Sequence, residues 1–132
     1  MRLFAANVIR FNEEILKIPK RRHGLMGDQE HLHLRKSLNE EITEFEEAYE
    51  KGDFIGCIDA LVDICYFAVG GLYKMGLSEV EIEKCGKLVH LANMMKARGE
   101  IARRATGAPD AVKPKGWKGP EEDMKAVLGW KM

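Results

Sequence analysis

Residues 53–75 read DFIGCIDALVDICYFAVGGLYKM, and this stretch decides the fold. Its apolar side chains point in nearly every direction around a helix, which is typical of a helix that is buried on most sides. The exceptions are Asp59 and Asp63, which lie four residues apart and therefore share one face. Gly52 and Gly76 bracket the stretch, so the sequence predicts a helix over 53–75.

The sequence before this stretch predicts two more helices. An apolar stripe at helical spacing covers 3–17, and Pro19 follows it. A second stripe covers 29–51, with Asp28 as its expected N-cap. The connecting loop is basic and contains two glycines.

The sequence after it predicts a long helix and a tail. Ser78 and Glu81 have the spacing of a capping box, so a helix should begin at Ser78 and run to about Arg104. The tail contains glycine and proline, and a short last helix should start at Pro120. No strand pattern is evident. The prediction is an all-α bundle of four to five helices.

Composition fits one domain over 1–132, in which 105–132 form the tail. The chain is 45% hydrophobic and 32% charged, with 21 basic and 21 acidic residues and no net charge. This balance argues against a duplex nucleic acid partner. On folding, a domain of this size buries only about two-thirds of the surface that its unfolded chain exposes. This favours a homodimer or homotetramer.

The compartment is predicted from the same sequence. Three cysteines, an odd number, argue against a disulfide framework. The first residues lack the apolar run of a signal peptide, and acidic residues interrupt the longest apolar stretch. We therefore expect a cytoplasmic protein with no membrane partner.

The helix over 29–51 carries the first candidate site residues. Glu41 lies at the edge of the apolar stripe, between Leu38 and Phe45, and Glu44 follows one turn later on the same edge. Glu40 points further outward. Carboxylates are rarely buried unless they are paired or coordinate a metal, so Glu41 is unusual. The alternative is an ordinary solvated acidic face.

Asp59 and Asp63 carry the stronger signal. Two like charges in an apolar helix repel each other and lose hydration, and a bound cation is the simplest compensation. The short turn at Gly52 should place this helix antiparallel to the preceding one, so that both present carboxylates to one space. An all-oxygen cluster suits magnesium with phosphate. Aspartates at the open end of a bundle, or salt bridges to lysine, are the alternatives.

Two later segments carry groups that suit a nucleotide. His90, Asn93 and Lys96 follow one another at three-residue spacing on one helix face. Lys113 and Trp117 belong to the basic turn KPKGW. Lysine and amide groups can hold phosphate oxygens or a nucleoside. A polar outer face, and a turn that packs the tail, are the alternatives.

These motifs together resemble the MazG-type all-α pyrophosphohydrolases. The matching motifs are EE-x-x-E at 40–44, DALVDICYFAVG at 59–70 and VHLANMMK at 89–96. The first helix and the KPKGW turn are also similar. The likeness is greatest to short phage and bacterial members related to phosphoribosyl-ATP pyrophosphohydrolase, and it covers residues 7 to about 120.

The resemblance implies a compact helical fold, usually a dimer or a dimer of dimers. It implies Mg²⁺, with Mn²⁺ as a substitute, and hydrolysis between the α- and β-phosphates. By motif position Glu41, Glu44 and Asp63 are the implied metal ligands, and Glu41 also belongs to the catalytic set. Glu40 is implied as a further ligand or as the group that orients water.

The chain departs from the family pattern at one position. The family has Glu or Asp three residues before the last Asp, where this chain has Ala60. Asp59 would have to take its place as the fourth metal ligand. Asn93 and Lys96 match positions expected to meet the nucleotide, and Lys96 would offset charge on the phosphates during bond cleavage.

The expected function is Mg-dependent hydrolysis of a nucleoside triphosphate to the monophosphate and pyrophosphate in nucleotide pool control. A deoxynucleotide such as dGTP is the expected substrate, in the host cytoplasm if the protein is phage-encoded. Phosphoribosyl-ATP is the alternative substrate, although the long tail and the VHLANMMK run point away from it. A non-enzymatic helical oligomerisation module is the second alternative, and the two aspartates in an apolar helix disfavour it.

Overall fold

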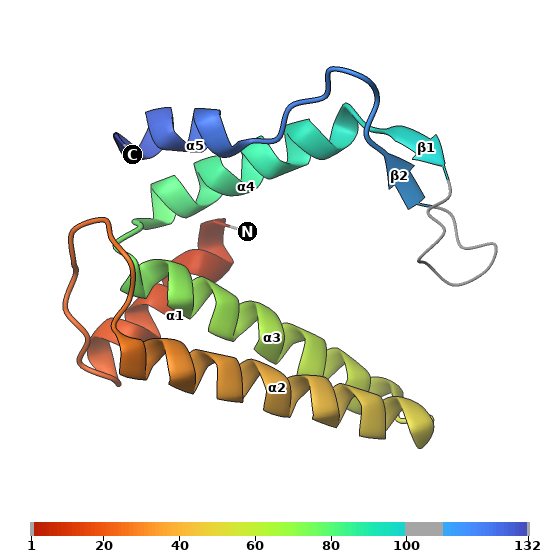
Figure 1. Cartoon of the computed structure of the whole chain (residues 1–132). Coiled ribbons are helices and arrows are strands. Elements are labelled where there is room, and N and C mark those ends of the chain that lie inside the picture. The colour runs from red at the N-terminus through yellow and green to blue at the C-terminus, as the bar shows by residue number, and fades with distance from the viewer. Residues whose placement is uncertain (1, 100–109, 132) are drawn as a thin grey trace. The chain divides into compact units, whose positions relative to one another are not determined.

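The computed structural model describes residues 2–99 and 110–131, and over these residues the protein is all-α with five helices (Figure 1). The described chain forms two compact units, residues 1–82 and 83–132.

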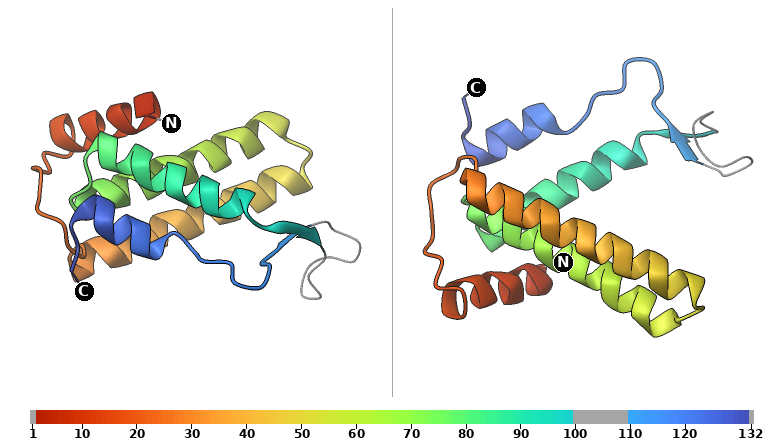
Figure 2. Two further views of the ribbon diagram at one scale, coloured as in Figure 1. Left: turned by 90° about the horizontal axis from the view of Figure 1, so that it is seen from above. Right: turned by 60° about the horizontal axis from the view of Figure 1, so that its bottom comes forward.

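The first unit is built on a helical hairpin. Helix α2 (Asp28–Glu50) and helix α3 (Phe54–Lys74) run antiparallel along most of their length (Figures 1 and 2). Gly52 takes a φ of +67° in the turn between them. The N-cap of α3 is Asp53, whose side chain accepts a hydrogen bond of 2.9 Å from the amide of Gly56. The short turn fixes the register in which α2 and α3 face each other.

Helix α1 (Arg2–Glu14) packs against α3. Val8 is fully buried, and the buried Asn12 side chain donates a hydrogen bond of 2.9 Å to the Val8 carbonyl. A Cβ on Gly70 of α3 would lie 3.4 Å from the Asn12 side-chain nitrogen, so glycine permits this close approach. Tyr66 of α3 receives Phe11 edge to face at 5.7 Å between ring centroids.

The loop between α1 and α2 is held against the C-terminal end of α3. Tyr73 donates a hydrogen bond of 2.7 Å to the carbonyl of Ile18. Arg21 donates to both carboxylate oxygens of Glu30 at 2.7 Å and also reaches the carbonyl of Lys74 at 3.2 Å. These bonds fix a loop whose sequence alone suggests little order.

Gly76 is essential to this arrangement, and replacing it should be costly. It has a φ of +93°, and an alanine Cβ would lie 2.5 Å from the Arg22 carbonyl oxygen and 2.8 Å from the His23 amide nitrogen. Backbone cannot yield as a flexible side chain can. We expect Gly76→Ala to lower the free energy of unfolding by about 2–4 kcal/mol, measured by urea denaturation.

Gly86→Ala is the matched control. Gly86 lies inside a helix, and a Cβ there would meet nothing within 4 Å. The same substitution should stabilise the protein by about 0.5–1 kcal/mol at this position. Equal changes in the free energy of unfolding for the two substitutions would show that the close approach of Gly76 to the loop does not contribute to stability.

The second unit contains most of helix α4 (Glu79–Met94), strands β1 (Ala97–Gly99) and β2 (Asp110–Val112), and helix α5 (Glu121–Leu128). The two strands pair antiparallel. After β2 the chain returns along α4 to α5 (Figures 1 and 2).

The predicted order of helices is confirmed, with two corrections at helix ends. The capping box at the start of α4 is present, with Ser78 and Glu81 exchanging hydrogen bonds of 3.0 and 3.2 Å. The N-cap of α2 is Gly27 and not Asp28, because Glu30 reaches back to the Gly27 amide. The helix predicted to run to about Arg104 ends at Met94, because the chain enters β1.

In a single copy of the chain, α3 is not buried on most sides. Phe54 is 73% exposed, Ile55 70% and Leu61 48%. By length and composition, α3 is also a helix that could cross a bilayer, a property that core helices of soluble proteins share. Its two aspartates would be costly at the centre of a bilayer.

Candidate active site

Helices α2 and α3 bring together the four carboxylates that the sequence predicts as metal ligands. Glu41 and Glu44 lie on α2, and Asp59 and Asp63 lie on α3. Glu41 and Asp63 are partly buried, whereas Glu44 and Asp59 are exposed. Spacings of three and four residues keep each pair on one helix face, and the hairpin turns the two faces toward each other.

Glu41 has the most perturbed acid–base properties of the four. Burial of its carboxyl raises its pKa to about 7, assisted by a hydrogen bond with Glu44 and by the negative charges of Glu44, Asp63 and Asp59. Its Oε2 atom is buried and has no hydrogen-bond partner. A buried carboxylate oxygen without a partner is costly, so this position suits a ligand that supplies positive charge.

Asp63 belongs to the same electrostatic cluster. Burial is the largest cause of its raised pKa, and the negative charges of Asp59 on the same helix and Glu44 on the neighbouring helix raise the pKa further. The carboxylates therefore repel one another across the α2–α3 pair. We call Glu41, Glu44, Asp59 and Asp63 the carboxylate cluster.

The carboxylate cluster has the chemistry of a hard-cation site. All its donors are oxygen atoms, which Mg²⁺ prefers, and a divalent cation would relieve the repulsion and partner the Glu41 Oε2 atom. In the described part of the chain no three acidic, histidine or cysteine side chains already surround one point closely enough to hold a metal ion. The side chains would have to close around the cation.

The shifted pKa of Glu41 predicts a gain in stability when its charge is removed. With divalent cations absent, the pKa of about 7 in the folded state exceeds the ordinary value of 4.5. The folded state therefore holds the proton more tightly, and wild type loses stability as the pH rises through this window. Glu41→Gln should be more stable at pH 8 by on the order of 1 kcal/mol.

Thermal unfolding at pH 5 and pH 8 in a chelating buffer measures this effect. The advantage of Glu41→Gln should be small at pH 5 and larger at pH 8. Glu46→Gln, an exposed change on the same helix, is the control and should show no such difference. A wild type that is as stable at pH 8 as Glu41→Gln would refute the repulsion.

Ala60 occupies the position where the resemblance to the MazG-type enzymes implies a carboxylate. Its side chain is buried, with 2% of its surface exposed, while the neighbouring Asp59 is exposed. The charge of Asp59 nevertheless raises the pKa of both Glu41 and Asp63. The structure thus associates Asp59 with the cluster at a more exposed position than the one that Ala60 fills.

Glu40 faces an open groove along the outer side of α2. The groove has a volume of about 720 Å³, and Glu44 also lines it, so the groove adjoins the carboxylate cluster. Arg35 and Lys36 line its other part. These two cations were not predicted as site residues, although their spacing of four residues from Asn39 and Glu40 places each pair on one helix face.

The second unit gathers three of the five residues predicted to bind substrate. The indole N–H of Trp117 donates a hydrogen bond of 2.8 Å to the carbonyl of Ala92. The ammonium nitrogens of Lys96 and Lys113 lie 5.0 and 4.9 Å from the centre of the same indole ring. His90 and Asn93 are exposed on α4.

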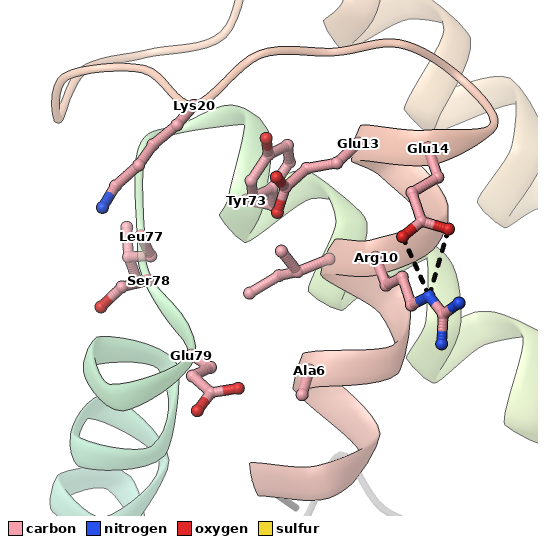
Figure 3. A pocket seen from close by; sticks show the side chains of 10 residues that line it. Ala6, Arg10, Glu13, Glu14, Lys20, Tyr73, Leu77, Ser78 and Glu79 are labelled. Atoms are coloured by element: carbon pink, nitrogen blue, oxygen red, sulfur yellow. Dashed lines mark hydrogen bonds and ion pairs between the residues drawn. The ribbon is translucent and has the colours of Figure 1, made fainter.

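A separate pocket of about 320 Å³ contains none of the predicted site residues (Figure 3). Ala6, Ile9 and Leu77 give it an apolar wall. Arg10 and Glu14 form an exposed ion pair of 3.0 Å at its edge. The other polar residues that line it are Glu13, Lys20, Tyr73, Ser78 and Glu79.

Comparison with known proteins identifies a family whose pattern covers helices α2 and α3. The sequence pattern of phosphoribosyl-ATP pyrophosphohydrolase matches residues 10–93, which include the whole carboxylate cluster, His90 and Asn93. Lys96, Lys113 and Trp117 lie beyond the matched segment. No curated protein matches the chain. The family match spans more than half of the sequence, and the chain therefore belongs to the phosphoribosyl-ATP pyrophosphohydrolase family.

Proposed function

We propose that this protein is a magnesium-dependent enzyme that hydrolyses a nucleoside triphosphate to the monophosphate and pyrophosphate. Membership of the family makes it a pyrophosphohydrolase that acts on nucleotides. The observation that carries the magnesium proposal is the carboxylate cluster, in which burial and mutual repulsion raise the pKa of Glu41 to about 7. A non-enzymatic oligomerisation module has no need of such a cluster.

Glu41, Glu44, Asp59 and Asp63 would hold the magnesium ion, with Mn²⁺ as a substitute. When bound, the ion neutralises phosphate charge and makes water a stronger nucleophile. Glu41 and Glu40 are the proposed catalytic carboxylates. The pKa of about 7 belongs to Glu41 in the metal-free protein, and bound Mg²⁺ would hold this carboxylate ionised.

Residues of the second unit would contact the nucleotide. Lys96 would offset negative charge as the bond between the α- and β-phosphates breaks, and Asn93 and His90 would meet the nucleoside. Arg35 and Lys36, in the groove beside Glu40 and Glu44, are further candidates for phosphate contacts. In the overall reaction, water adds to the α-phosphorus and pyrophosphate leaves.

A deoxynucleoside triphosphate such as dGTP is the proposed substrate, with a role in nucleotide pool control in the cytoplasm. Phosphoribosyl-ATP is the second candidate, and the name of the matched family favours it. The two substrates share a triphosphate chain. Phosphoribosyl-ATP carries an additional ribose phosphate on its adenine base, whereas dGTP has guanine and no such group. A direct comparison of hydrolysis rates therefore separates the two candidates.

The test is hydrolysis of the eight common nucleoside triphosphates and phosphoribosyl-ATP with Mg²⁺ in water enriched in ¹⁸O. We expect pyrophosphate as the released product and the label in the monophosphate, because attack occurs at the α-phosphorus. Excess chelator should abolish turnover. Orthophosphate as the first product, label in pyrophosphate, or full activity with chelator would refute the proposal.

We also propose that the active form is a homodimer or homotetramer. The exposed apolar side chains of α3, including Phe54, Ile55 and Leu61, would be covered by a second copy. Sedimentation at micromolar concentration measures the assembly state. An active monomer would contradict this part of the proposal.

A further inference from the structure

Three observations in the second unit converge on Lys96 and Lys113. The first is the register of the two short strands. Ala97 pairs with Val112 at the end of the β1–β2 ladder. Lys96 directly precedes Ala97 and Lys113 directly follows Val112, so the pairing places the two lysines side by side although 16 residues separate them in the chain.

The second observation is that both lysines lie against one aromatic ring. Their ammonium nitrogens are 5.0 and 4.9 Å from the centre of the Trp117 indole. The two nitrogens are thus at most about 10 Å apart, comparable with the Debye length at physiological salt, so their charges act together. Among the residues described, neither ammonium group has a carboxylate partner.

The third observation is that Trp117 itself is anchored. Its indole N–H donates to the Ala92 carbonyl at 2.8 Å, near the end of α4. Its own amide bonds to the Pro114 carbonyl at 3.0 Å, and Gly116 between them has a φ of +81°. This combination matches a type II turn with glycine at its third position. Trp117 is therefore held both by its backbone amide and by its indole N–H.

One indole cannot neutralise two cations. A cation–π contact at an exposed site contributes about 0.5–1 kcal/mol, and two ammonium groups share one ring here. An anion with several oxygen atoms would satisfy both at once. A phosphate chain is such an anion.

We propose that Trp117 is a positioning residue that holds Lys96 and Lys113 together as a clamp for the phosphate chain of the substrate. This inference rests on the proposed function for the identity of that substrate. It adds Lys113 and Trp117, beyond the segment that the family pattern matches, to the groups that determine substrate affinity. It applies to any nucleoside triphosphate, because the clamp addresses phosphates and not the base.

Binding of inorganic triphosphate without divalent cations tests the clamp. Trp130→Phe leaves Trp117 as the only tryptophan of the two in the chain, so its fluorescence reports the site. Calorimetry gives the affinity of each variant. Lys96→Gln and Lys113→Gln should each weaken triphosphate binding about tenfold and reduce its dependence on salt concentration.

Lys115→Gln is the matched control. Lys115 lies in the same turn and is exposed, and no contact joins it to the indole in the described part of the chain. It should change the affinity less than about twofold. If Lys115→Gln weakens binding as much as the other two, the effect is general electrostatic attraction and the clamp is wrong.

Two substitutions test the positioning role of Trp117. Trp117→Phe keeps a ring for the lysines but lacks the N–H that anchors it, and should weaken triphosphate binding about three- to fivefold. Trp117→Ala should weaken it about tenfold and lower its salt dependence. A role confined to packing the tail would leave the salt dependence unchanged, and that result would overturn the proposal.

The outcome is separable from that of the proposed function. Triphosphate binding that requires Lys96 and Lys113, in a protein that hydrolyses no nucleotide, would support the clamp and refute the enzyme. Normal hydrolysis with triphosphate binding indifferent to Lys96→Gln and Lys113→Gln would refute the clamp alone.

Discussion

Asp63→Asn should reduce turnover by on the order of 1000-fold or more, because asparagine keeps the shape of the side chain but lacks the charge that a divalent cation requires. Asp63 is partly buried on α3, within the electrostatic reach of Asp59 and Glu44. Its burial means that few other groups could replace it. The affinity for Mg²⁺ should fall together with turnover.

The fold of Asp63→Asn should survive. Burial and the charges of Asp59 and Glu44 raise the pKa of Asp63, so the ionised group is disfavoured in the metal-free protein. Removing that charge relieves repulsion, and the thermal midpoint in chelating buffer should stay equal or rise. A loss of activity with an unchanged midpoint separates chemistry from folding.

Asp53→Asn provides the control on the same helix. Asp53 is the N-cap of α3, and asparagine caps helices about as well as aspartate does. This variant loses the same charge at a distance from the cluster and should retain activity. Near-normal turnover and Mg²⁺ affinity in Asp63→Asn would mean that the carboxylate cluster is not the active site.

Much of this site could be predicted from sequence because helical spacing determines which residues share a face. The i, i+4 relation of Asp59 and Asp63, and the place of Glu41 at the edge of an apolar stripe, need only the 3.6-residue repeat. The short turn at Gly52 then requires α2 and α3 to be neighbours. The cluster follows from local rules and one turn.

What covers the apolar faces of α3 could not be predicted in this way. Periodicity identifies apolar faces but does not say what covers them, and Phe54 and Ile55 are exposed at the beginning of the helix. Strands β1 and β2 escaped prediction because three residues are too short for an alternating pattern. The proximity of Lys96 and Lys113 depends on that strand pairing, so it could not be predicted either.

The burial of Ala60 gives the departure from the family pattern a physical meaning. A small side chain fills a position with 2% exposure, where the family has a carboxylate, and Asp59 supplies charge from the next position. If Asp59 has taken over the missing function, the site needs one carboxylate at either position. The protein should then remain active when the carboxylate is moved from position 59 to position 60.

Asp59→Asn alone should therefore lower Mg²⁺ affinity and turnover by more than the about 10- to 100-fold loss that removing a supporting group causes. Asp59→Asn combined with Ala60→Glu should recover at least about a tenth of wild-type turnover, because the carboxylate returns at the family position. Calorimetric titration with Mg²⁺ and steady-state kinetics measure both effects.

Asp59→Asn combined with Ala60→Gln is the decisive control, since glutamine matches glutamate in volume and differs in charge. Both double variants should lose about 1–3 kcal/mol of stability from overpacking at the buried Ala60 position, and without a cation the glutamate variant should lose more because its charge is buried near other carboxylates. Urea denaturation measures both losses. Recovery of activity by glutamate and not by glutamine would assign the effect to the carboxylate. If neither double variant recovers while both remain folded, the position of Ala60 does not face the cation.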